Sequence, residues 1–144
     1  MEIEVSEQEE YPDLEDIPVA EIAEFVCRNL NLTNGSCHII FRNNNALQAL
    51  HAEFFDDPSF TDVITFNLGK DTIEGEIYIA VGQAKSQSIE YKVPLSEEIA
   101  RLIIHGFLHL KGYEDELEED RKIMKEHENY VVAMVKEHIL ANHA

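Results

Sequence analysis

His105 and His109 stand four residues apart, and Gly112 and a pair of acids, Glu114 and Asp115, follow them closely. Residues four apart on a helix point the same way, so two imidazoles at this spacing can bind one metal ion. A glycine ends a helix readily because it adopts left-handed backbone conformations, and the chain could then turn back to offer a carboxylate. The spacing His-x-x-x-His-x-x-Gly-x-x-Asp predicts a zinc site with at least one open position.

Gly106 separates this pattern from that of the helical zinc proteases. Those enzymes carry a glutamate directly after the first histidine, where it acts as general base. Glycine can neither accept a proton nor orient a water molecule, so hydrolysis would need another base, the substrate or a metal-bound hydroxide. The simpler alternative is a packed helix with two histidines at its surface edge and Gly112 as an ordinary cap.

Residues 105–113 read His-Gly-Phe-Leu-His-Leu-Lys-Gly-Tyr, residues 61–66 read Thr-Asp-Val-Ile-Thr-Phe, and residues 75–79 read Gly-Glu-Ile-Tyr-Ile. In order and spacing these segments resemble the YbeY family of bacterial rRNA-maturation endoribonucleases. That family has the signature His-Gly-x-Leu-His-Leu-x-Gly-Tyr-Asp-His and the strands Thr-Asp-Val-Leu-Ser-Phe and Gly-Asp-Ile-x-Ile. The resemblance runs roughly from residue 37 to residue 135. It implies a zinc-dependent endoribonuclease that cleaves single-stranded RNA in rRNA maturation and ribosome quality control.

The resemblance also implies the metal ligands, which are His105, His109 and Asp115, with one zinc ion per chain. Asp115 stands where the family signature has its third histidine, and an aspartate can ligate zinc through oxygen. A carboxylate ligand makes the site more anionic and more tolerant of other divalent metals. Three further acids remain rival third ligands: Glu114, Glu118 and Glu119.

A second departure from the family lies upstream of residue 61. The family usually carries an arginine there, which is expected to act on the phosphate. Phe55 stands at the matching position, and no Lys or Arg lies between Arg42 and Lys70. The sequence therefore assigns no catalytic residue beyond the metal ligands.

The net charge of −18 argues against tight, unassisted RNA binding, because nucleic-acid affinity depends on basic groups that neutralise phosphates. The 11 Lys and Arg residues could still gather on one face. We expect rRNA and components of the small ribosomal subunit as partners, with an assembly GTPase as a further one. No Gly-rich phosphate loop indicates a nucleotide cofactor, and no apolar run approaches the roughly 20 residues that span a membrane.

Two other function classes fit the same residues. An acidic metalloprotein could assist ribosome assembly by binding basic ribosomal proteins or a GTPase, with weak or no nuclease activity. A metal-dependent hydrolase of a small molecule or peptide is the third class, and Gly106 argues against its usual peptidase form. The surface beside His105 discriminates among these classes, since a basic groove favours RNA and a wholly acidic rim favours a protein partner.

The elements that position these residues indicate an α+β fold, an α/β sandwich with one mixed four-stranded sheet and helices packed on it, as a single domain over residues 1–144. The metal-bearing helix should open at residues 94–96 with Ser96 as its cap. Residues 82–93 suggest a loop or a short helix. Cys27 and Cys37 lack metal spacing and suit buried free thiols. With an acidic N-terminus in place of a signal peptide, we expect a cytoplasmic protein.

Overall fold

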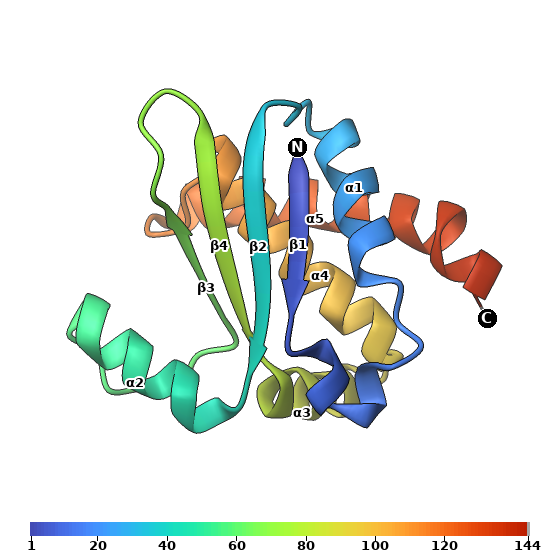
Figure 1. The fold of residues 1–144 in the computed structure, drawn as a ribbon, viewed down its shortest axis with the longest axis horizontal. Coiled ribbons are helices and arrows are strands. Elements are labelled where there is room, and N and C mark those ends of the chain that lie inside the picture. Colours follow the sequence, from blue (N-terminus) through green and yellow to red (C-terminus); the bar gives the residue numbers. More distant parts are fainter. Residues whose placement is uncertain (144) are drawn as a thin grey trace.

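The computed structural model describes residues 1–143 and contains one mixed four-stranded sheet with helices packed against it (Figure 1). Its strands are β1 (Glu2–Ser6), β2 (Gly35–Arg42), β3 (Val63–Asn67) and β4 (Ile73–Ala80), in the spatial order β1-β2-β4-β3. The first two strands and β4 run parallel, and β3 runs antiparallel to β4 at the sheet edge. The predicted α+β sandwich with a single mixed sheet is confirmed.

The described chain has five α-helices: α1 (Val19–Asn29), α2 (Asn44–Phe55), α3 (Val81–Tyr91), α4 (Leu95–Lys111) and α5 (Glu118–His138). Short 3-10 turns η1 (Gln8–Glu10), η2 (Pro12–Leu14) and η3 (Leu140–His143) complete the described chain. In Figure 1, α1, α4 and α5 cover one face of the sheet, and α2 lies at a corner of the other. Within residues 1–143, no helix is long and apolar enough to cross a membrane.

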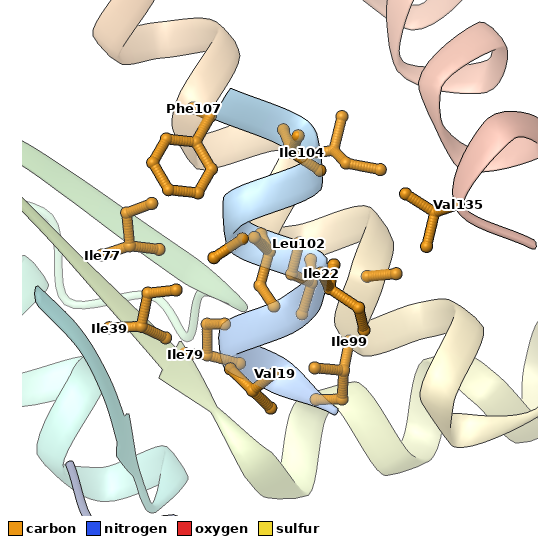
Figure 2. Packing of buried hydrophobic residues seen from close by; sticks show 14 of the residues in the cluster. Val19, Ile22, Ile39, Ile77, Ile79, Ile99, Leu102, Ile104, Phe107 and Val135 are labelled. Atoms are coloured by element: carbon orange, nitrogen blue, oxygen red, sulfur yellow. The ribbon is translucent and has the colours of Figure 1, made fainter. Parts of the chain in front are cut away.

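The main core lies between the sheet and α1, α4 and α5 (Figure 2). Alternate strand residues point to this side, so Ile39, Ile77 and Ile79 are fully buried against the helices. On α4, the apolar residues recur at helical spacing, and Ile99 and Phe107 are also fully buried. Because so much of its surface is buried, α4 is a rigid support for the two histidines that it carries.

The start of α4 differs from the prediction. The helix begins at Leu95, directly after Pro94, and no side chain caps it. Ser96 lies inside the first turn, so its predicted role as the cap is wrong. Glu97 and Glu98 occupy that turn as expected, where carboxylates favour the positive end of the helix dipole.

Of the two alternatives predicted for residues 82–93, a loop or a short helix, the structure has the helix, α3. The 11-residue helix buries Val81, Ala84 and Ser88 on one side. It ends at Lys92, which adopts a left-handed backbone conformation (φ 57°). Only this spaced set of small and apolar residues indicated a helix, because the intervening residues are polar.

Gly106 lets α4 approach the sheet closely. A Cβ at this position would lie 2.7 Å from Cδ1 of Ile77 and 3.0 Å from its Cγ1 and Cγ2. Ile77 is itself fully buried, and protein interiors are packed too densely for a side chain to shift without cost. We therefore expect Gly106→Ala to cost up to about 3 kcal/mol in overpacking. Because alanine regains about 1 kcal/mol in helix propensity, the free energy of unfolding should fall by up to about 2 kcal/mol.

Urea unfolding of the two proteins measures this change. An unchanged or raised midpoint for Gly106→Ala would show that the helix and the sheet do not meet as closely as described. It would also mean that the glycine is not required by packing.

Cys27 and Cys37 are free and buried, as predicted. Burial raises the pKa of the Cys27 thiol to about 12 and that of the Cys37 thiol to about 12. A thiol with a raised pKa stays protonated as the pH increases, and only the thiolate reacts readily. We expect neither thiol of the folded protein to react with a disulfide reagent at pH about 8, and both to react in denaturant. Rapid reaction of a thiol before unfolding would contradict their burial.

Candidate metal centre

The end of α4 and the turn after it bring the predicted ligands together. Gly112 adopts φ 114°, a conformation that side-chain-bearing residues rarely take. Its N–H donates to the carbonyl of His109 (3.0 Å), and the N–H of Tyr113 donates to the carbonyl of Leu108 (3.0 Å). These bonds end the helix and reverse the chain, so that Asp115 returns to the histidines.

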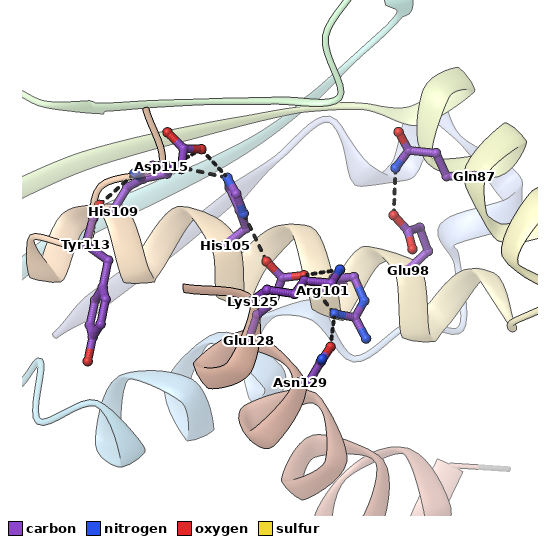
Figure 3. A network of polar contacts seen from close by, with 10 residues as sticks. All are labelled: Gln87, Glu98, Arg101, His105, His109, Tyr113, Asp115, Lys125, Glu128 and Asn129. Carbon is purple, nitrogen blue, oxygen red and sulfur yellow. Dashed lines mark hydrogen bonds and ion pairs between the residues drawn. The ribbon is translucent and has the colours of Figure 1, made fainter. Parts of the chain in front are cut away.

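The ligand atoms of these three residues form a triangle (Figure 3). Nε2 of His105 lies 3.1 Å from Nε2 of His109. Oδ2 of Asp115 lies 3.6 Å from the first of these nitrogens and 3.3 Å from the second. Nitrogen and oxygen ligands about 2.0–2.1 Å from a tetrahedral zinc ion stand about 3.3–3.4 Å apart, so the triangle has the size of one tetrahedral face. The group could therefore hold a metal ion.

The three side chains are partly open to solvent, as an accessible site requires. The exposed fractions are 26% for His105, 27% for His109 and 40% for Asp115. Among the residues that the structure describes, this is the one group of at least three histidine, cysteine or acidic side chains close enough to share an ion. The rival acids Glu114, Glu118 and Glu119 are exposed and do not join it.

Each histidine is held in one orientation by its other ring nitrogen. Nδ1 of His105 lies 3.0 Å from Oε2 of Glu128, and Nδ1 of His109 lies 3.0 Å from the carbonyl oxygen of Tyr113. A carboxylate and a carbonyl accept hydrogen bonds, so each Nδ1 carries the hydrogen and each Nε2 keeps its lone pair for the site. The ring of Tyr113 lies against His127 and takes no part in the triangle.

Glu128 is the centre of a buried charge network. Its Oε1 accepts hydrogen bonds from Arg101 (2.7 Å) and Lys125 (3.3 Å), and the residue is only 5% exposed. Burial alone would raise the pKa of Glu128, but the hydrogen bonds from His105 and Arg101 outweigh it and lower the pKa to about 2. Burial likewise tends to lower the pKa of His105, but its bond to Glu128 and that group's charge raise it overall.

Glu128 is not among the predicted site residues, although the sequence holds a signal for it. The buried stripe of α5 runs through Met124, Glu128, Val131 and Val135, at helical spacing. A glutamate on an apolar stripe is rarely buried without a partner. The pattern indicated a paired carboxylate, but it did not indicate which residue pairs with it.

A cleft of roughly 270 Å³ opens beside the triangle. The stripe of α4 that carries His105 forms its floor, with α3, α5 and the start of β3 around it. Three cations line it, Arg101, Arg121 and Lys125, together with four acids, Asp62, Glu98, Asp115 and Glu128. The surface beside His105 is therefore mixed in charge. It is neither a basic groove nor the wholly acidic rim that would favour a protein partner.

Phe55, at the position of the family's arginine, contributes no charge to this cleft. It ends α2, is 52% exposed, and stacks on Phe66 with ring centroids 6.0 Å apart. His51, one turn earlier, contacts the ring of Phe55 and the carbonyl of Ser59 and does not join the triangle. The cations beside the site come instead from α4 and α5.

The fold and the site together define a class of protein: an α+β sandwich in which a helix end and the following turn bring two histidines and a carboxylate together beside an open cleft. The chain belongs to the YbeY family. The family model described as Endoribonuclease YbeY matches residues 3–136, which is nearly the whole chain.

Curated relatives agree with this assignment. The chain is 36% identical over 107 residues to Endoribonuclease YbeY of Azobacteroides pseudotrichonymphae, covering 74% of this chain and 77% of the relative. It is 36% identical over 101 residues to Endoribonuclease YbeY of Flavobacterium psychrophilum, covering 69% and 71%. The solution structure of TM1509 from Thermotoga maritima is similar in fold, with a TM-score of 0.69 and 25% identity, covering 97% of this chain and 93% of that one.

Proposed function

We propose that this chain is a zinc-dependent endoribonuclease that cleaves single-stranded RNA in rRNA maturation and ribosome quality control. The observation that carries the proposal is the triangle formed by His105, His109 and Asp115. Three protein ligands at tetrahedral spacing, with one side open to a cleft, are typical of catalytic rather than structural zinc sites. Family membership and the names of the relatives support RNA as the substrate.

In this proposal His105 and His109 bind the ion through Nε2, and Asp115 binds it through a carboxylate oxygen. A zinc ion there would lower the pKa of a bound water toward neutrality and offset charge on the phosphate. Gly106 packs so closely on Ile77 that a glutamate would not fit at its position. The close packing therefore argues against the peptidase alternative.

We assign the phosphate contacts to Arg121 and Lys125. Both are exposed residues of α5 that line the cleft together with His105. Arg121 also donates to the carbonyls of Asp115 (3.3 Å) and Glu116 (2.9 Å), which steadies the turn that carries the carboxylate ligand. These two cations would supply the positive charge that Phe55 does not.

We further propose that the chain is a single metal-binding domain over residues 1–144, acts in the cytoplasm without a nucleotide cofactor, and receives rRNA from small-subunit components. One observation favours the alternative of an assembly protein with an additional GTPase partner. The sheet face opposite the main core carries four glutamates, Glu2, Glu4, Glu74 and Glu76. Such a surface suits basic proteins. If that role dominates, Glu74→Lys with Glu76→Lys abolishes co-sedimentation with ribosomal subunits.

The nuclease proposal is tested by incubating a labelled single-stranded RNA with chelator-treated protein, before and after zinc is restored. We expect no cleavage without the metal and endonucleolytic products once it is added. Equal cleavage in both samples would contradict metal dependence. No cleavage in either sample would contradict the nuclease proposal and favour the alternative of an assembly protein.

A further inference from the structure

The cleft extends well beyond the triangle along α4. Glu98 and His105 both line it, and they stand seven positions apart on that helix. Seven residues of α-helix span about 10 Å, so the two side chains lie at different ends of the same cleft. Figure 3 shows Glu98 beside Gln87, away from the group around His105. A nucleotide whose phosphate lay at the triangle would have space for a base toward Glu98.

Glu98 is an unusual wall residue, because it is only 2% exposed and no cation among residues 1–143 bonds to it. Oε2 accepts a hydrogen bond from Nε2 of Gln87 (2.7 Å), and Oε1 accepts none from the described residues. Burial raises the pKa of this carboxyl, and the hydrogen bond from Gln87 and the charge of Arg101 offset the effect only in part. A donor from a ligand in the cleft would satisfy the free oxygen.

Gln87 is oriented by its neighbours. Its Oε1 lies 3.3 Å from Nε2 of Gln83, and its own Nε2 donates to Glu98. A side-chain amide has two N–H groups, so one donor of Gln87 remains for a ligand. Glu98 and Gln87 together therefore offer a ligand one acceptor, the carboxylate oxygen, and one donor, the amide N–H.

The lining of the cleft also suits the face of a flat ring. The apolar residues of this lining are Val63, Leu102 and Met124. Tyr91 follows Gln87 by one turn of α3, lines the same cleft, and is 58% exposed. Exposed aromatic rings are the usual surfaces on which unpaired RNA bases stack.

We propose that Glu98 and Gln87 recognise the edge of an RNA base that carries an exocyclic amino group. The carboxylate oxygen accepts from the amino group, and the amide N–H of Gln87 donates to the neighbouring ring nitrogen. Adenine and cytosine present this donor beside an acceptor, whereas hypoxanthine and uracil present a carbonyl beside an N–H. The inference rests on the proposed function, since it assumes that the cleft receives RNA. A mere structural tie between α3 and α4 would give no preference among bases.

Two matched pairs of nucleotides test this recognition without any cleavage. Cytidine and uridine monophosphate differ only in that an amino group beside a ring nitrogen is replaced by a carbonyl beside an N–H, and so do adenosine and inosine monophosphate. Each is titrated into isotope-labelled, zinc-supplied protein at neutral pH while the side-chain amide resonance of Gln87 is followed. We expect the amino member of each pair to bind about fivefold tighter, which corresponds to about one base-edge hydrogen bond.

Three variants separate recognition from stacking and from folding. Glu98→Gln should erase the preference, because an amide can turn to pair with either base type. Glu97→Gln is the matched control, since that residue pairs with Lys136 outside the cleft and should leave the preference unchanged. Tyr91→Ala should lower the affinity for all four nucleotides equally, because it removes the stacking surface and leaves Glu98 and Gln87 in place.

Equal affinities within both pairs, or a preference that survives in Glu98→Gln, would overturn the inference. Failure of the nuclease proposal would be seen in the RNA cleavage assay and not in these titrations. In that case RNA stays intact with zinc present, whatever the nucleotide titrations show.

Discussion

His109→Ala should abolish metal binding, and RNA cleavage with it, while the protein stays folded. The substitution removes one corner of the triangle and leaves His105 and Asp115 as the remaining ligands. Loss of an outer partner alone typically costs 10–100-fold in metal affinity, so loss of a ligand should cost more than about 100-fold. The side chain is partly exposed, and its bond to the carbonyl of Tyr113 contributes about 1 kcal/mol to stability. Unfolding should therefore stay cooperative.

Zinc titration by calorimetry and the RNA cleavage assay measure the two effects. His51→Ala is the control, because that histidine lies on α2 and contacts Phe55 and Ser59 instead of the site. We expect the control to bind zinc and cleave RNA like the native chain. Cleavage that persists in a metal-free His109→Ala protein would refute the proposed mechanism.

Glu128→Gln should lower zinc affinity by about 10–100-fold without removing any ligand. The carboxylate fixes the ring of His105 through Nδ1 and makes that imidazole a stronger ligand. An amide of the same shape still accepts one hydrogen bond but lacks the charge that pairs with Arg101. Breaking a buried pair leaves a cation uncompensated and costs up to about 3–5 kcal/mol of stability. Arg101 retains some solvent contact, so we expect the lower part of that range.

Glu126→Gln is the matched control, on the exposed side of α5 and outside the cleft. Metal affinity and the urea midpoint are measured for both variants. If Glu128→Gln binds zinc like the control, the network around Glu128 serves only to join α4 to α5, and the orientation argument is wrong.

The triangle could be predicted because its geometry is local. Three features lie within 11 residues of each other: the helical spacing of His105 and His109, the glycine that ends the helix, and the acid that follows. One helix and one turn are enough to place all three side chains. The choice of Asp115 over Glu114, Glu118 and Glu119 rests on the family register, and of these four acids the structure brings only Asp115 to the histidines.

The surroundings of the triangle could not be predicted, because they depend on how distant segments pack. Glu128 reaches His105 across 23 residues, and Gln87 reaches Glu98 across 11. From the sequence, Glu98 is an ordinary acidic residue in the first turn of α4, and its favourable interaction with the helix dipole is enough to explain its presence there. Its burial follows only from the position of α3, and the weak periodicity of residues 82–93 could not distinguish that helix from a loop.

The positions of the cations in the cleft could not be predicted either, for the same reason. The sequence has a long stretch without Lys or Arg before β3, which suggested that the site lacks positive charge. Arg121 and Lys125 belong to α5, and no local pattern relates them to His105. Only the packing of α5 on α4 places them beside the triangle.

Elemental analysis of tag-free protein, beside Asp115→Ala and Glu114→Ala, tests the central claim most directly. We predict about one zinc ion per chain in the native protein and in Glu114→Ala, and none in Asp115→Ala, as expected for a site with three protein ligands. Zinc retained by Asp115→Ala and lost from Glu114→Ala would move the third ligand to the neighbouring acid. No metal in the native chain, even after zinc is supplied, would contradict the proposed metal centre and the nuclease mechanism built on it.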